Sequence, residues 1–79
     1  MDQIEKFLRK RTEKEHSILM AAINLIARNE WGGLDVKKLK GFKHLFRIRV
    51  GNFRIIVEKG KKGNYIVKID ERDGQTYKI

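Results

Sequence analysis

The hydrophobic period of the chain changes once, from about 3.6 residues to 2, at Trp31-Gly32-Gly33. Before this point apolar residues recur on one helix face, and after it they alternate along segments bounded by turns. A chain of 79 residues is long enough for one domain and too short for two. The pattern predicts a single α+β domain over residues 1–79. We expect a helical hairpin in 1–31, packed on one face of a three- to four-stranded antiparallel meander sheet in 36–79.

Two helices are predicted before the glycines. Asp2 is a suitable N-cap for a short first helix, whose apolar residues have i, i+3, i+4 spacing: Ile4, Phe7 and Leu8. Thr12 and Glu15 have the spacing of a capping box, so a second helix is expected from about 13 to 29. The residues expected on its inner face are Ile18, Leu19, Ala22, Ile23, Leu25, Ile26 and Asn29.

The first β-hairpin has a predicted register, because Gly51-Asn52 is suited to a two-residue turn. This turn places Arg49 opposite Arg54. Arg47 then lies opposite Ile56 on the same outer face. The residues predicted on the helix-covered face are Phe46, Ile48, Val50, Phe53, Ile55 and Val57.

A second turn at residues 60–63 leads to the next strand. If this loop has an odd number of residues, Tyr65, Val67 and Ile69 face the core and Lys68 lies opposite Arg54. A fragment at 76–79 is expected to add a fourth short strand.

The net charge of +9 is unevenly distributed. Residues 1–31 carry six basic and five acidic side chains, whereas residues 32–79 carry thirteen and five. Cations placed directly opposite each other destabilise a sheet, and arginine forks match phosphate oxygens. The outer sheet face is therefore predicted to bind nucleic acid; the alternative is a solvated face. The basic residues expected to contact the phosphate backbone are Lys37, Lys38, Lys40, Lys43 and Lys68.

Several classes of function are disfavoured by composition. The chain has no Cys, only two histidines, His16 and His44, and scattered carboxylates, so no metal site is predicted. There is no P-loop, dinucleotide motif or nucleophile elbow, and no cofactor is expected. No apolar run approaches the roughly 20 residues of a membrane span, and there is no signal-peptide pattern. We expect a cytoplasmic protein.

Two segments resemble a known family. Residues 36–41 read VKKLKG and residues 45–56 read LFRIRVGNFRII. Together with the preceding helical hairpin, they resemble the RelE/ParE superfamily of toxins from type II toxin–antitoxin modules. Members of that family usually begin with a β-strand before the hairpin. Since this sequence starts at the helix, we expect a sheet that is one strand short and has an exposed edge.

The resemblance carries implications for function. RelE-like members cleave mRNA in the ribosomal A site without a metal, and ParE-like members poison DNA gyrase. Matched by motif, the residues implied in catalysis are Arg47, Arg49, Arg54, Arg72 and Tyr77. The resemblance favours a ribosome-dependent mRNA endoribonuclease. A gyrase inhibitor and an inactive RNA-binding module remain alternatives.

The implied chemistry is cleavage of RNA by its own 2′-hydroxyl. Guanidinium groups would stabilise the charged phosphorane. Tyr77, with an ordinary pKa of about 10, would need neighbouring cations to lower that pKa before it could act as the base. The implied partners are mRNA on the ribosome and an acidic, partly disordered antitoxin. This antitoxin would cover the arginine face or add a strand to the exposed edge.

Overall fold

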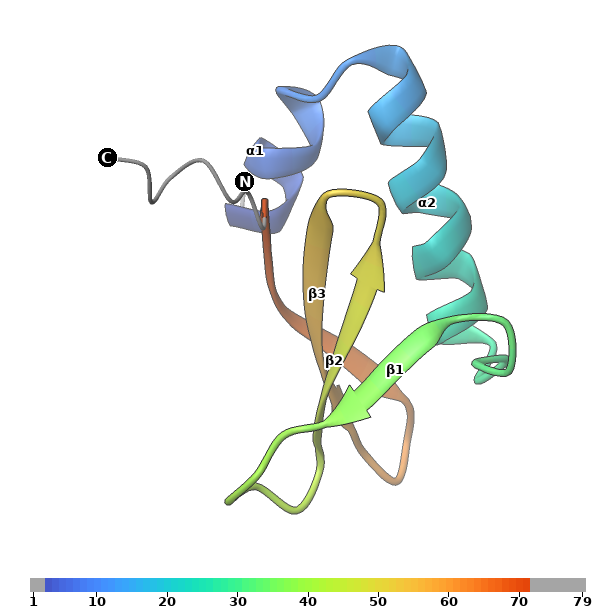
Figure 1. The fold of residues 1–79 in the computed structure, drawn as a ribbon, viewed down its shortest axis with the longest axis vertical. Helices are drawn as coiled ribbons and strands as arrows, with labels where there is room; N and C mark the ends of the chain where they lie inside the picture. Colours follow the sequence, from blue (N-terminus) through green and yellow to red (C-terminus); the bar gives the residue numbers. More distant parts are fainter. Residues whose placement is uncertain (1–2, 72–79) are drawn as a thin grey trace.

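The computed structural model describes residues 3–71 and has an α+β fold (Figure 1). Its two helices are α1 (Gln3–Arg9) and α2 (Glu13–Ala27). Its four strands are β1 (Asp35–Lys38), β2 (Leu45–Val50), β3 (Phe53–Lys59) and β4 (Asn64–Glu71). The strands form an antiparallel meander in the order β1-β2-β3-β4. The predicted fold class is confirmed.

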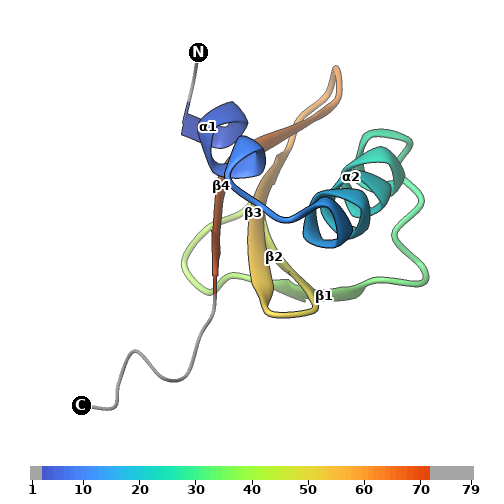
Figure 2. The same cartoon turned by 90° about the horizontal axis from the view of Figure 1, so that it is seen from above.

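Strand β1 lies in a segment for which the sequence analysis predicted basic residues but no strand. It precedes the β2–β3 hairpin and pairs with β2. The described sheet thus spans residues 35–71, and the strand expected at 76–79 falls outside the described residues. Of the described strands, β1 and β4 form the two edges, and α1 lies beside β4 (Figure 2).

Local hydrogen bonds set both ends of α2. The Thr12 hydroxyl accepts a hydrogen bond from the Glu15 N–H at 3.1 Å, and the Glu15 carboxylate accepts one from the Thr12 N–H at 3.2 Å. The predicted capping box is confirmed. At the other end Asn29 adopts φ 61°, and the Glu30 N–H donates to the Leu25 carbonyl at 2.9 Å. This left-handed residue ends the helix at Ala27, two residues earlier than predicted.

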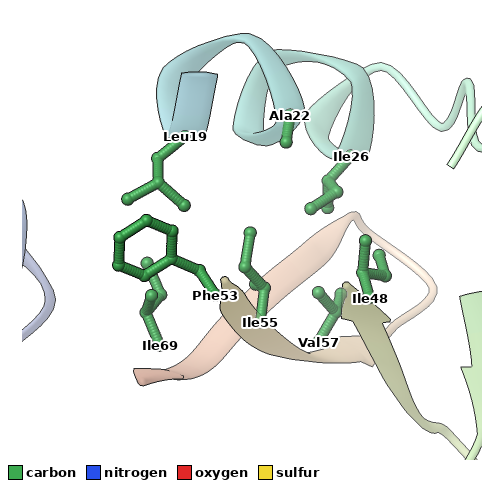
Figure 3. Close-up of a cluster of buried hydrophobic side chains, with 8 residues drawn as sticks. All are labelled: Leu19, Ala22, Ile26, Ile48, Phe53, Ile55, Val57 and Ile69. Carbon is green, nitrogen blue, oxygen red and sulfur yellow. The ribbon is translucent and has the colours of Figure 1, made fainter. Parts of the chain in front are cut away.

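The core lies between the helices and one face of the sheet (Figure 3). From α2 come Leu19, Ala22 and Ile26; from the strands come Ile48, Phe53, Ile55, Val57 and Ile69. The predicted β2–β3 register is confirmed, with Val50 opposite Phe53. Two residues that were expected on the inner face of α2 are exposed. Ile18 is 42% exposed, because the buried stripe of the helix is narrower than predicted, and Asn29 lies beyond the end of the helix.

The predicted register of β4 is wrong, and over the first half of the strand the predicted inward and outward faces are wrong as well. Lys59 pairs with Asn64, so the loop has an even number of residues and Tyr65 lies opposite Glu58 on the outer face. A bulge then takes up Val67, which is 53% exposed, and returns Ile69 to the core. Tyr65 and Val67 are therefore not core residues.

The same bulge changes which charges face each other. Lys68 lies opposite Ile56, and Asp70, rather than Lys68, lies opposite Arg54. The physical reason is twofold: the even-numbered loop shifts the pairing by one residue, and the bulge shifts it by one more.

A long-range hydrogen bond anchors the start of β4. The Asn64 side-chain amide donates to the Ile26 carbonyl at 2.8 Å and to the Asn29 side-chain oxygen at 3.3 Å. The Ile26 carbonyl also accepts from the Trp31 indole N–H at 3.3 Å. The end of α2 is thereby tied to the β3–β4 turn.

Candidate nucleic-acid interface

The sheet face opposite the helices carries two adjacent rows of side chains that run across all four strands. The first, which we call the paired row, consists in order of Asp35, Arg49, Arg54 and Asp70. The second, which we call the basic row, consists of Lys37, Arg47, Ile56 and Lys68. The paired row has no net formal charge, and the basic row carries three positive charges.

In the paired row, each arginine has an aspartate as its outer neighbour. Arg49 Nε lies 3.8 Å from Asp35 Oδ2, and Arg54 Nε lies 3.6 Å from Asp70 Oδ1. Lys68 of the basic row also reaches Asp70, with Nζ 3.4 Å from Oδ2. These pairs are partly exposed, so each contributes little to stability. Their main effect is to offset the repulsion between Arg49 and Arg54, which lie directly opposite each other.

Arg47 is the least compensated arginine of the face. It is half-buried, and within residues 3–71 it forms no ion pair. Its Nε is buried and lacks a hydrogen-bond partner in this part of the chain. Its neighbour on β1 is Lys37, another cation. Because no carboxylate of this range offsets its charge, an anion that reaches the guanidinium group would be favoured.

The acidic partner on β1 is the main feature of the face that sequence analysis missed. Asp35 lies opposite Arg49, although the sequence analysis placed no acidic residue beside that arginine. The signal was weak because the strand has the sequence Asp-Val-Lys-Lys, with a single apolar residue at 36. Because β1 was not predicted as a strand, Asp35 could not be assigned to the sheet face.

The loop between β1 and β2 adds further cations beside the basic row. Lys38, at the end of β1, and Lys40 and Lys43 in the loop are exposed, and their contact with a phosphate backbone stays a prediction. Residues 38–43 line a shallow pocket of about 480 Å³. Phe42, which the sequence analysis did not single out, lies among these lysines and is 56% exposed.

The structure brings together three of the five residues implied in catalysis. Arg47, Arg49 and Arg54 share one sheet face on adjacent strands. Arg72 and Tyr77 lie outside the described residues. His16 and His44 are exposed and stand apart from the two rows. Within residues 3–71, no three His, Asp or Glu side chains are grouped as metal ligands would be.

A second group of cations lies at the end of β3, where the Lys59 N–H donates to the His44 carbonyl at 2.8 Å. Lys59 Nζ lies 4.6 Å from the centre of the Trp31 ring, and the adjoining turn carries Lys61 and Lys62. Sequence analysis did not identify this cation–π contact, because it joins a residue that follows α2 to the end of β3.

Neither helix of the described chain is long and apolar enough to cross a membrane.

Comparison with known proteins gives one short similarity. No protein-family model matches the sequence, and no solved structure matches it. A stretch of 25 residues is 60% identical to "Toxin RelE3" of Methanocaldococcus jannaschii. The match covers 32% of this chain and 28% of the length of that relative. Over this stretch the chain is similar to a RelE-family toxin, in agreement with the resemblance of its basic motifs.

Proposed function

We propose that this protein is the toxin of a type II toxin–antitoxin module and that it cleaves mRNA on the ribosome. The observation that carries the proposal is the clustering of Arg47, Arg49 and Arg54 on one open sheet face. The sequence similarity to a protein named as a RelE toxin supports the assignment to toxins in general. The arginine cluster favours an RNA target, because guanidinium groups bind phosphates in two-pronged geometry.

The proposed reaction is transesterification at one phosphodiester. The 2′-oxygen attacks phosphorus, the bond from phosphorus to the 5′-oxygen breaks, and the products are a 2′,3′-cyclic phosphate and a 5′-hydroxyl. A base takes the proton of the 2′-hydroxyl, and an acid protonates the leaving oxygen. In this scheme Tyr77 is the base, and the arginines stabilise the charge that develops on the phosphorane.

Arg47 is the arginine best suited to hold the reacting phosphate. Its side chain is half-buried, and no carboxylate of residues 3–71 lies within ion-pairing distance of it. An arginine is a poor proton donor at neutral pH, so its role is electrostatic. Arg72 is proposed to assist from the segment that carries Tyr77.

The test is in vitro translation with the purified protein, followed by primer extension to map mRNA 5′ ends. Wild-type protein should cut within A-site codons only when ribosomes are present. Arg47→Ala and Tyr77→Phe should each reduce cleavage by at least about 100-fold, the range seen when one electrostatic or acid–base group is lost. Arg28→Ala removes the same charge from the end of α2 and should cleave normally.

Intact mRNA in the presence of ribosomes would contradict the nuclease proposal. A gyrase supercoiling reaction, run with the same preparation, then tests the alternative target. Inhibition of supercoiling would identify a gyrase-directed toxin instead.

The proposed partner is an acidic antitoxin that covers the open sheet face. Complementary charge favours such a partner and makes its binding sensitive to salt. Lys37→Ala and Arg47→Ala should weaken the complex and lower its salt dependence. Unchanged affinity in both variants would place the antitoxin elsewhere, for example along the edge of β4.

A further inference from the structure

Phe42 is a large apolar side chain presented to solvent by the loop between β1 and β2. It is 56% exposed and is not among the hydrophobic residues that pack against the core. A single exposed apolar residue is common on protein surfaces. The significance of Phe42 therefore depends on how the loop holds it and on what surrounds it.

The loop holds Phe42 in a tight turn. The Phe42 N–H donates to the Leu39 carbonyl at 3.4 Å, and the third residue of the turn, Gly41, has φ 83°. This is the conformation that a type II turn requires at its third position, and glycine adopts it without strain. The Leu39 N–H donates to the Leu45 carbonyl at 3.0 Å, which closes the base of the loop. The backbone of Phe42 is thus fixed before any ligand binds, which lowers the entropy lost on binding.

The charged residues next to Phe42 in its loop are basic. Lys40 and Lys43 flank it in the sequence, and residues 36–57 contain no Asp or Glu. Residues 38–43 line the shallow pocket, and three of these six residues are lysines. An aromatic ring in a cationic groove is the arrangement by which proteins bind single-stranded nucleic acid: bases stack on the ring and phosphates contact the cations.

We propose that Phe42 is a stacking platform for one unpaired base of the RNA, with the flanking phosphates at Lys40 and Lys43. This inference rests on the proposed function for the identity of its ligand. Single-stranded RNA suits the site better than an acidic protein segment, because each of its bases has a π-face and a phosphate on either side. That pattern matches one aromatic residue between two lysines.

The test is binding of a fluorescein-labelled, single-stranded 2′-deoxy oligonucleotide of about eight nucleotides, followed by fluorescence anisotropy. This probe lacks the 2′-hydroxyl and is not cleaved, so the result does not depend on the proposed nuclease activity. Phe42→Leu keeps an apolar side chain but removes the ring, and it should weaken binding by roughly 5- to 150-fold. Phe42→Trp should restore binding to the wild-type level or above. The slope of log K against log salt should stay the same in both variants.

Two further measurements separate stacking from charge and from misfolding. An abasic chain of the same length should bind wild type and Phe42→Leu equally, because it offers no base to stack. Lys40→Ala should reduce the salt slope by about 0.7 for either chain. The thermal midpoint of Phe42→Leu should match that of wild type, since the side chain is exposed.

The proposal is overturned if Phe42→Leu binds the base-containing probe as tightly as wild type. It is also overturned if the loss is the same on the abasic chain. A loss of affinity for an acidic peptide, with unchanged oligonucleotide binding, would assign Phe42 to a protein interface instead. If Phe42→Leu weakens oligonucleotide binding but the wild-type protein makes no A-site cuts, the stacking inference is supported and the nuclease proposal is contradicted.

Discussion

At the scale of single residues, Asp70 controls how much positive charge the open face presents. Its two oxygens lie 3.6 Å from Arg54 Nε and 3.4 Å from Lys68 Nζ. The carboxylate therefore competes with an incoming phosphate for both cations. Its Oδ1 is buried without a hydrogen-bond partner among residues 3–71, so an amide oxygen in its place would lose no hydrogen bond.

Asp70→Asn should accordingly tighten binding of a single-stranded oligonucleotide and steepen its salt dependence by about 0.7, the contribution of one further phosphate contact. The measurement is anisotropy across a series of salt concentrations. Glu30→Gln, which adds the same charge beside the end of α2, is the matched control. Equal tightening in the two variants would mean that only net charge matters and that Asp70 has no specific role.

At the scale of elements, the prediction of α2 from sequence succeeded where its determinants are local. The capping box joins residues three apart, so Thr12 and Glu15 could be recognised directly from their spacing. The β2–β3 register followed from a two-residue turn for the same reason. In contrast, Tyr65-Ile66-Val67 are three apolar residues in a row, so alternation does not show which of them face the core. In the structure, the arrangement that the strand adopts is accompanied by a hydrogen bond from Asn64 to α2, across 38 residues.

The capping box gives a stability prediction for α2. Thr12→Ala should lower the free energy of unfolding by about 1 kcal/mol, because the Glu15 N–H loses its acceptor. For a domain of this size the thermal midpoint should fall by about 4–8 °C. Thr12→Ser keeps the hydroxyl and should remain close to wild type. An equal fall in both variants would show that the methyl group, rather than the hydrogen bond, is responsible.

At the scale of the whole molecule, sequence analysis predicted the arrangement of layers and the face that carries the arginines. Both follow from hydrophobic periodicity, which places apolar residues such as Ile48 and Ile55 on one side. The balance of charge on the outer face could not be predicted in the same way. It depends on Asp35 and Asp70, whose positions are set by a short polar strand and by a bulge.

The hydrogen bond from Asn64 to the Ile26 carbonyl has a consequence for the order in which the protein folds. Each strand of the meander pairs with its neighbour in the chain, so the sheet has mainly local contacts and can form early. The tie between α2 and the β3–β4 turn can form only when the helix docks. We expect it to be absent from the transition state, so that Asn64→Ala speeds unfolding about fivefold and changes the refolding rate by less than about twofold. Stopped-flow measurements in denaturant test this, and slowed refolding with unchanged unfolding would mean that the helix docks before the rate-limiting step.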